Sequence, residues 1–322
     1  ALDGLTVLIP CRNEAERLPH LIDDLRAQSH PVRILVIDDA SSDATAEAAR
    51  RTGVTCIAAH GTGKKAALAT GYAQVETPWF ATVDADVRLG ADWAQTLLAD
   101  AMAHGTACVL GGVAMDGKAN AFERFQRLEF AVMQRWISGG VQAGRLAMGS
   151  GANSLYRTAD YPVHELEPRY ASGDDAFALK ALRERGQSIR WCGNPAARVT
   201  TAPAPNWKSL WQQRARWASK TSGQDRETRT TALTVAAVHI AGLALLVHAA
   251  WRGTGDSLVA LCGFWALKGL ADVPLLRQAS KEFGWRLQAL DLLTFSLRYA
   301  VLVCGAWWQL LFASVHWNGR QI

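Results

Sequence analysis

The residues of this chain best suited to chemistry are carboxylates set in short motifs. In Asp84-Ala85-Asp86 the two acids stand two residues apart. Such a pair can hold a hard divalent cation, which in turn neutralises a diphosphate. The motif follows a predicted buried strand, which directs its side chains into the crevice where ligands of α/β sheets bind. The simpler alternative is a solvated loop at the end of a strand.

Two more acidic pairs lie at predicted element boundaries. Asp38-Asp39 ends a strand, where a carboxylate can accept hydrogen bonds from a nucleobase N–H or a ribose hydroxyl. Asp174-Asp175 follows Gly173 and precedes an apolar helix, and one of the two could be a general base that deprotonates a hydroxyl acceptor. The alternative for both pairs is helix capping, which Asp43 could also provide after the first pair.

Two adjacent lysines, Lys64 and Lys65, stand just before a predicted helix. A helix N-terminus favours phosphate, so either lysine could contact a phosphorylated ligand. The alternative is a pair of ordinary surface lysines.

A basic and aromatic motif, Gln213-Arg-Ala-Arg-Trp217, lies on a helix predicted to begin near Asn206. Gln213 and Arg216 share one face because they are three apart, and Trp217 is four from Gln213. Arg214 cannot point the same way as Arg216. Arginine suits a leaving diphosphate, since it is always charged and can bind with two parallel hydrogen bonds.

The elements that must position these motifs alternate between strand and helix. Short apolar runs predict strands at 5–9, 34–37, 54–58 and 79–83, the first of them stopped by Pro10. Helical spacing falls between them, at 14–28, 44–51 and 65–75. Fully apolar strands separated by helices predict an α/β fold with a parallel sheet covered on both faces. Both early acidic motifs then lie at the carboxyl ends of strands, the edge where ligands bind.

The glycine-rich segment Gly61-Thr-Gly-Lys64 does not meet the P-loop pattern. That pattern needs a glycine where Ala58 stands, and a Ser or Thr where Lys65 stands. No GxGxxG follows the first strand either. The sequence therefore disfavours an ATP P-loop or a nicotinamide site.

The last third of the chain is mostly apolar. Residues 231–250 contain no charged side chain, and about 20 such residues cross the hydrocarbon core of a bilayer. Segment 257–276 carries Lys268 and Asp272, which are four apart and could pair on one helix face. Segment 289–312 carries Asp291 and Arg298. Ionisable groups at membrane depth usually face protein or water and find partners there.

An amphipathic helix is predicted at 120–137, with apolar residues at helical spacing and three arginines between them. Such a helix can lie on a membrane surface. The alternative is a helix whose apolar face covers the sheet.

Loop charges predict the orientation of the apolar segments. Six Lys or Arg residues fall in 206–230, one in 251–256 and three in 277–286, which places the globular domain and the second turn in the cytoplasm. Three spans leave the tail outside, whereas a re-entrant middle segment keeps it inside. We divide the chain into 1–205, a motif-bearing interfacial helix at 206–230, and a membrane region at 231–322 with helices near 231–251, 257–276 and 289–312.

Composition bounds the remaining choices. The net charge of +5 over 322 residues fits anionic lipid headgroups or a phosphorylated substrate and does not require nucleic acid. The six cysteines are scattered without a CxxC pair, which favours small buried thiols in a reducing compartment over zinc ligands. No signal peptide is expected, because charged residues follow the first short apolar run.

Taken together, the motifs resemble those of the family 2 glycosyltransferases, the GT-A-fold group that includes cellulose, chitin and hyaluronan synthases and ceramide glucosyltransferase. The resemblance covers about residues 4–220. It implies nucleotide-sugar binding by Pro10, Arg12, Glu14, Asp38, Asp39, Lys65, Asp84, Gln213, Arg214 and Trp217, with Asp39 on the base. It implies a metal site at Asp84 and Asp86, an acceptor-side loop with Gly149, Ser150, Gly151 and Asn153, and catalysis by Asp175 with Asp174 and Arg216.

By this resemblance the reaction is inverting transfer from a UDP-linked or other nucleotide sugar, with Mg²⁺ or Mn²⁺. At most three apolar segments are present, where processive synthases enclose a channel with more helices. We therefore expect a multi-pass enzyme of the inner membrane that moves a hexosyl or N-acetylhexosaminyl group to a lipid or membrane-embedded hydroxyl. The alternatives are a processive polysaccharide synthase with a partner and a non-catalytic membrane scaffold. No nucleic-acid partner is expected.

Overall fold

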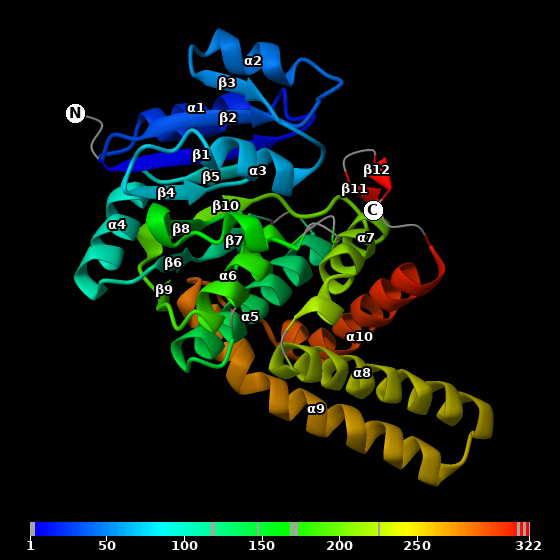
Figure 1. Ribbon diagram of the computed structural model, residues 1–322. Coiled ribbons are helices and arrows are strands. Elements are labelled where there is room, and N and C mark those ends of the chain that lie inside the picture. Colours follow the sequence, from blue (N-terminus) through cyan, green and yellow to red (C-terminus); the bar gives the residue numbers. More distant parts are fainter. Residues whose placement is uncertain are drawn as a thin grey trace. The chain divides into compact units, whose positions relative to one another are not determined.

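The computed structural model describes residues 4–116, 120–146, 148–167, 170, 173–224 and 226–313, and the backbone of 316–317 and 320–321 (Figure 1). The chain divides into two compact units. Ala1–Ala114 and Ile137–Ala202 form the first, which we call the sheet unit. Met115–Trp136 and Pro203–Ile322 form the second, the helical unit. The division near residue 202 is close to the predicted limit at 205, but the helical unit also takes in a stretch from the middle of the chain.

The sheet unit is built on a seven-stranded sheet with the order β3-β2-β1-β4-β8-β6-β9. The first four strands pair in parallel, as the alternation of strands and helices predicted. The remaining part differs, because β8 runs antiparallel to both β4 and β6 while β9 is parallel to β6. The strands are β1 (Leu5–Cys11), β2 (Arg33–Asp38), β3 (Thr55–Ala58), β4 (Trp79–Thr82), β6 (Cys108–Gly111), β8 (Ser154–Arg157) and β9 (Ile189–Cys192).

Strand β1 is central and every one of its residues is buried. It continues through Pro10 to Cys11, beyond the predicted stop. Its pairing with β4 ends at Leu8 opposite Thr82, whereas its pairing with β2 goes on to Cys11 opposite Asp38. Pro10 therefore lies where β1 is paired on one side only, a position at which a missing N–H is tolerated. The register brings the carboxyl ends of β1, β2 and β4 to one edge of the sheet.

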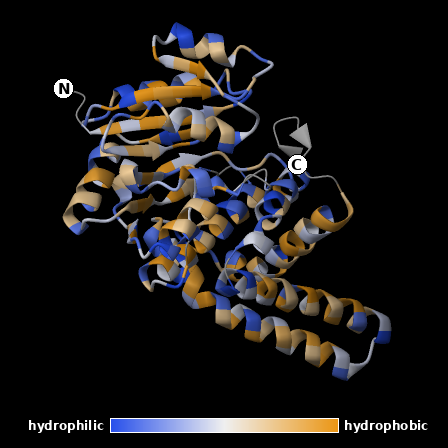
Figure 2. Cartoon of the chain, in the orientation of Figure 1, coloured by the Kyte–Doolittle hydropathy of each residue, from blue (hydrophilic) through white to orange (hydrophobic). Residues whose placement is uncertain are grey.

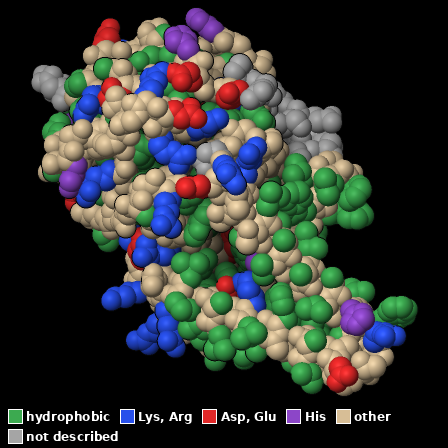
Figure 3. All heavy atoms as spheres, turned by 60° about the horizontal axis from the view of Figure 1, so that its bottom comes forward, with side chains coloured by type: hydrophobic (Ala, Val, Ile, Leu, Met, Phe, Trp, Pro, Cys, Tyr) green, Lys and Arg blue, Asp and Glu red, His purple; other side chains and the backbone are tan. Residues whose placement is uncertain are grey.

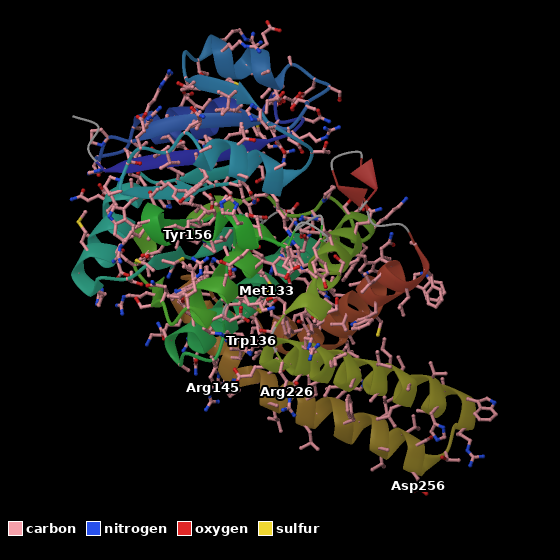
Figure 4. All side chains as sticks on the ribbon, viewed as in Figure 1. Met133, Trp136, Arg145, Tyr156, Arg226 and Asp256 are labelled. Carbon is pink, nitrogen blue, oxygen red and sulfur yellow. The ribbon has the colours of Figure 1, made fainter. Side chains whose placement is uncertain are left out.

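Helices connect these strands, and a small three-stranded sheet adds to them. The helices are α1 (Leu18–Arg26), α2 (Thr45–Arg51), α3 (Lys64–Tyr72), α4 (Trp93–His104) and α6 (Asp174–Glu184), with short 3₁₀ turns at Thr158–Asp160, Val163–Glu165 and Pro195–Ala197. The small sheet has the order β5 (Val87–Leu89), β10 (Val199–Thr201), β7 (Val113–Met115). Tyr156 of β8 (labelled in Figure 4) is fully buried. Its ring stacks on that of Phe80, with ring centroids 5.4 Å apart. Aromatic packing of this kind fixes the middle of the sheet.

The helical unit holds α7 (Trp207–Ala218), the 3₁₀ turn Thr221–Gly223 and the long helices α8 (Arg226–Arg252), α9 (Gly255–Glu282) and α10 (Ala289–Phe312). The short strands β11 (His316–Trp317) and β12 (Arg320–Gln321) pair near its end. The first part of α5 (Ala121–Gln142) also belongs to it. Helix α7 begins beside Asn206, as predicted, and the structure adds that Asn206 caps it, its side chain accepting a hydrogen bond from the Ser209 N–H.

The amphipathic helix predicted at 120–137 corresponds to the first part of α5, and its apolar face is covered by protein. Phe125 and Leu128 are buried in one cluster with Leu210 of α7, Leu276 of α9 and Phe295 of α10. Helices of the same unit therefore cover these two residues. The predictions that a membrane surface or the sheet covers them are both wrong. Apolar periodicity shows that a face is buried, but it does not identify what covers that face.

Helices α8, α9 and α10 are long and apolar enough to cross a bilayer by length and composition. Helices α8 and α9 form a hairpin whose length is largely hydrophobic in Figure 2, and green apolar side chains gather along its surface in Figure 3. Arg226 starts the hairpin and Asp256 lies at its tip (Figure 4). The middle segment is one helix of 28 residues with Pro274 inside it, longer than the predicted 257–276.

Three ionisable residues of these helices, Lys268, Asp272 and Asp291, have side-chain partners. Lys268 donates to both oxygens of Asp272, at 2.6 and 2.5 Å, as their spacing suggested. Ser296 of α10 donates to Asp272 at 2.6 Å, so the pair also joins two helices. Asp291 does not pair with Arg298 and instead accepts from Arg124 of α5, at 2.9 and 2.8 Å.

Candidate active site

One lysine brings together the acidic motifs of the sheet unit. The ammonium of Lys64, the first residue of α3, lies 2.5 Å from Asp84 Oδ1 and 3.7 Å from Asp174 Oδ2. Burial disfavours its charged form, but Asp174 and Asp84 outweigh this and raise the pKa of Lys64. The lysine is therefore a fixed cation between the loop after β4 and the first turn of α6.

The neighbouring Lys65, which the resemblance marked as donor-binding, has other contacts. Its ammonium donates to the backbone carbonyl of Glu167 at 2.7 Å and lies 4.5 Å from the centroid of the Phe177 ring. Lys64 is thus the lysine beside the acidic motifs. Residue types alone could not distinguish the two, because adjacent residues of a first helical turn point in different directions.

Asp174 and Asp175 occupy the first turn of α6, and Gly173 is the N-cap residue. The pair therefore does not cap the helix, but negative charge there is favoured by the helix dipole. Asp174 is buried, and Asp175 is half-buried and accepts a hydrogen bond from the Gly151 N–H at 3.2 Å. The loop predicted on the acceptor side thus contacts the predicted base.

Gly151 is required by space at this contact. A Cβ atom on it would lie 2.9 Å from Asp174 Oδ2 and 2.9 Å from the Lys64 ammonium. Gly149 is similarly crowded, by Leu110 and Leu179 of the core. The loop can approach the charged groups only because it has no side chain at residue 151.

Asn153, expected on the acceptor side, is a structural residue instead. It is fully buried, and its amide donates to the carbonyls of Gly112 and Ala197 at 2.9 and 2.8 Å. Its carbonyl oxygen accepts from the Trp93 indole at 2.9 Å. With both amide hydrogens and its oxygen engaged by protein, Asn153 does not present its side chain to an acceptor. Ser150 remains at the loop, where its hydroxyl accepts from the Ala152 N–H.

The turn after β2 is held by contacts from β1 and from the start of α3. Asp39 is buried, and one of its oxygens accepts from the Gly63 N–H at 2.9 Å. Arg12 donates to the carbonyls of Asp39 and Ala40, both at 2.7 Å. Asp38 accepts from the backbone and hydroxyl of Ser41. These contacts fix the orientation of the pair at the predicted nucleotide edge.

Neither residue of the Asp38-Asp39 pair caps α2. Asp43 accepts a hydrogen bond from the Thr45 N–H at 3.0 Å, so Asp43 is the acid that bonds to the backbone at the start of α2. Ala44 is the N-cap residue of α2 and makes no side-chain capping bond.

A cluster of negative charge surrounds Glu14, which follows β1. Burial raises the pKa of Glu14 to about 7; Arg17 opposes the shift, while Asp86 and Asp84 add to it. Burial, and then the charge of Asp84, also raise the pKa of Asp86. Arg17 lies 3.0 Å from Glu14 Oε2 and 3.7 Å from Asp86 Oδ2. Even with Arg17 present, this edge of the sheet retains excess negative charge.

That excess fits a divalent cation. Asp84 and Asp86 supply hard oxygen ligands, and Mg²⁺ is commonly held by one or two carboxylates together with substrate phosphates. Among the residues that the structure describes, no group of three or more His, Cys, Asp or Glu side chains could hold a metal by itself. The protein thus offers a partial site, of the kind that a bound diphosphate would complete.

The two arginines of the Gln213–Trp217 motif, in the helical unit, have different environments. Arg214 is 8% exposed and forms a two-pronged ion pair with the buried Glu129 of α5, at 3.3 and 2.5 Å. It also donates to Gln213 at 2.5 Å, and the Trp217 ring lies 4.2 Å from its guanidinium. Arg214 therefore takes part in an internal network, and its expected contact with the nucleotide stays a prediction. Arg216 is half-buried on the same helix.

Comparisons with known proteins bear on these motifs. Residues 6–161 match the profile of Glycosyl transferase family 2. An uncharacterized glycosyltransferase of Mycobacterium tuberculosis is 26% identical over 206 residues, which are 64% of this chain and 82% of that relative. A 4,4'-diaponeurosporenoate glycosyltransferase of Staphylococcus aureus is 39% identical over 102 residues, which are 30% of this chain and 27% of that relative.

Among solved structures, the mannosyltransferase PcManGT of Pyrobaculum calidifontis in complex with GDP-Man and Mn²⁺ is similar, with a TM-score of 0.50 and 16% identity. The likeness covers 96% of this chain and 87% of that one. At this identity the similarity concerns the fold.

Proposed function

From the match of residues 6–161 to Glycosyl transferase family 2, we propose that the protein transfers a sugar from a nucleotide-sugar donor to a hydroxyl group of a membrane lipid.

The observation that carries this proposal is the convergence on Lys64. A single ammonium within 4 Å of both Asp84 and Asp174 brings the proposed metal motif and the proposed base motif to one place in the sheet unit.

Each residue of this place has a role in the proposed reaction. Mg²⁺ or Mn²⁺ at Asp84 and Asp86 would neutralise the donor diphosphate as it leaves. Asp39, held by Gly63, accepts hydrogen bonds from the nucleobase. Asp175 takes the proton of the acceptor hydroxyl, and the Gly151 N–H orients its carboxylate for that step. Lys64 holds Asp84 and Asp174 in place. Separately, on the motif resemblance alone, we propose that Arg216 of the helical unit steadies the leaving diphosphate. Attack by the hydroxyl on the face opposite the leaving group inverts the sugar carbon.

Two relatives support the donor and the acceptor. The archaeal mannosyltransferase binds GDP-Man and Mn²⁺, which favours a nucleotide sugar with a divalent metal for this fold. The staphylococcal relative acts on diaponeurosporenoate, a lipid-like acceptor, although the match covers only 27% of that protein. The apolar helices α8, α9 and α10 would keep the enzyme beside a lipid acceptor in the bilayer. We propose the inner membrane, with the sheet unit in the cytoplasm.

The test is nucleotide release by the purified chain in detergent with mixed lipids and Mn²⁺. The donors are UDP-glucose, UDP-galactose, UDP-N-acetylglucosamine and GDP-mannose. We expect release from one donor, stimulated by lipid and lost with a chelator. Asp175→Asn should lower the rate by roughly 10²-fold or more, the usual range for loss of a general base. Asp92→Asn, at an exposed carboxylate before α4, is the matched control and should keep the rate. Undiminished release by Asp175→Asn would remove the base assignment.

A further inference from the structure

We propose that the helical unit binds an anionic phospholipid of the bilayer, with part of its acyl chain in an aromatic pocket and its phosphate on Arg298. The pocket is lined by Ala121, Phe122 and Phe125 of α5, Trp207 of α7 and Arg298 of α10. The proposal concerns a site of the helical unit alone and does not depend on the catalytic assignment.

The charge of Arg298 is the first argument. Among the described residues no carboxylate lies within ion-pairing distance of Arg298, and its hydrogen bond to protein is one long contact of 3.3 Å to the Ala121 carbonyl. Asp291, the acid on the same helix, is already bound to Arg124. A guanidinium has five N–H donors, so most of those on Arg298 are left to a ligand.

The location of Arg298 makes that excess charge costly. It lies within α10, one of the helices long and apolar enough to cross a bilayer. Charged groups at membrane depth usually pair with one another or with polar groups. Lys268 follows this rule through Asp272, whereas Arg298 does not have such a partner among the described residues. An anion from the lipid would supply it.

The pocket walls suit a hydrocarbon chain. Phe122 and Phe125 pack against Trp207, with ring centroids 5.0 and 5.6 Å apart, and Phe125 also packs against Phe295. These contacts hold the rings in place before a ligand arrives. The volume of about 230 Å³ is below the roughly 300 Å³ at which pockets for whole small molecules begin, so it fits a segment of a chain.

The two features together select the ligand. Arginine binds phosphate with two parallel hydrogen bonds, and the aromatic walls add an apolar contact that a free phosphate ion cannot make. A net negative headgroup also avoids the cation of a zwitterionic lipid beside Arg298. We therefore assign the pocket to an anionic phospholipid and not to a soluble phosphate.

The test is native mass spectrometry of the full chain in detergent, titrated with phosphatidylglycerol, phosphatidylcholine or inorganic phosphate. We expect phosphatidylglycerol to bind at least tenfold more tightly than phosphatidylcholine, and inorganic phosphate not to bind. Arg298→Gln should remove this preference. Phe122→Ala, at a half-buried wall residue, should weaken binding of both lipids and keep the preference. Arg277→Gln, at an exposed arginine of α9, is the matched control and should bind as the wild type does.

Three results would overturn the proposal. They are unchanged phosphatidylglycerol binding by Arg298→Gln, equal binding of the two lipids by the wild type, and binding of inorganic phosphate as tight as that of phosphatidylglycerol. If Arg298→Gln does not fold, Arg298→Lys decides. It keeps the charge but loses the two-pronged contact, so phosphatidylglycerol should bind more weakly than to the wild type, and an undiminished affinity would contradict the proposal.

Discussion

Gly151 is the residue at which the geometry of the proposed site is most constrained. In Gly151→Ala the new Cβ would meet Asp174 and the Lys64 ammonium, each at 2.9 Å. The Lys64 ammonium must then move, which disturbs its contact with Asp84. We expect nucleotide release to fall by roughly tenfold or more, because small displacements of positioned groups lower rates strongly. Gly193→Ala, where nothing lies within 4 Å of the new atom, is the control. Equal rates for the two variants would contradict this account.

Glu14 gives a pH dependence of stability. Its pKa is raised from 4.5 to about 7 by burial and by Asp86 and Asp84, so the folded chain holds this proton more tightly than the unfolded chain. The contribution to stability is therefore present below pH 4.5 and is lost as pH rises through about 7. At 1.36 kcal/mol per pKa unit the loss is at most about 3 kcal/mol.

The variant Glu14→Gln tests this sign. It should unfold at a higher temperature than the wild type at pH 8, and the difference should disappear toward pH 4.5. Thermal unfolding at a series of pH values measures it. If the wild type is more stable than Glu14→Gln at pH 8, the folded protein favours the charged form of Glu14. That result would contradict the raised pKa.

Other residue assignments show what the sequence can and cannot predict. Residue type and the position after a strand single out Asp38-Asp39 and Asp84-Ala85-Asp86, and their chemical roles stay predictions. Which of Lys64 and Lys65 faces Asp84 could not, since that depends on the direction in which α3 starts. Asn153 was wrong as an acceptor residue because its burial depends on Trp93, Gly112 and Ala197, which are remote in the sequence.

At the scale of elements, α7 combines a structural and a proposed chemical arginine. Arg214→Met leaves Glu129 buried without its partner, and breaking a buried pair in this way costs about 3–5 kcal/mol. We expect a clear fall in the unfolding temperature. Replacing both residues, as in Glu129→Leu with Arg214→Met, should restore much of it.

Arg216→Gln should affect activity and not stability. It should lower nucleotide release by roughly 10²-fold, the usual loss for one group that stabilises transition-state charge, with little change in unfolding temperature. Unfolding temperatures and release rates of both variants decide the matter. The assignment fails if Arg214→Met is as stable as the wild type, or if Arg216→Gln remains active.

The elements themselves were predictable where the pattern is local. The four parallel strands follow from apolar runs, and the start of α7 near Asn206 was also predicted from the sequence. The antiparallel placement of β8 does not, because a four-residue strand carries no sign of which strands it will join. The GT-A fold expected from the resemblance is confirmed by the mixed α/β sheet and the similarity to the archaeal mannosyltransferase.

At the scale of the whole molecule, we propose a topology for the three apolar helices. With the sheet unit in the cytoplasm, α8 leaves it, α9 returns and α10 leaves again. A reporter fused after Gly253 should then lie outside the cytoplasm, and one fused after Gly284 should lie inside. Paired alkaline phosphatase and green fluorescent protein fusions measure this. The same side for both positions would contradict a crossing by α9.

The central claim is that the sugar is transferred to a membrane lipid. The most direct measurement supplies the full chain with membrane lipid extract, Mn²⁺ and each donor labelled in its sugar, and follows the label into the organic phase. We predict label in one lipid product from one donor, absent with Asp175→Asn and with chelator. Label found only in water-soluble product, or in a ladder of oligomers, would contradict transfer of a single sugar to a lipid.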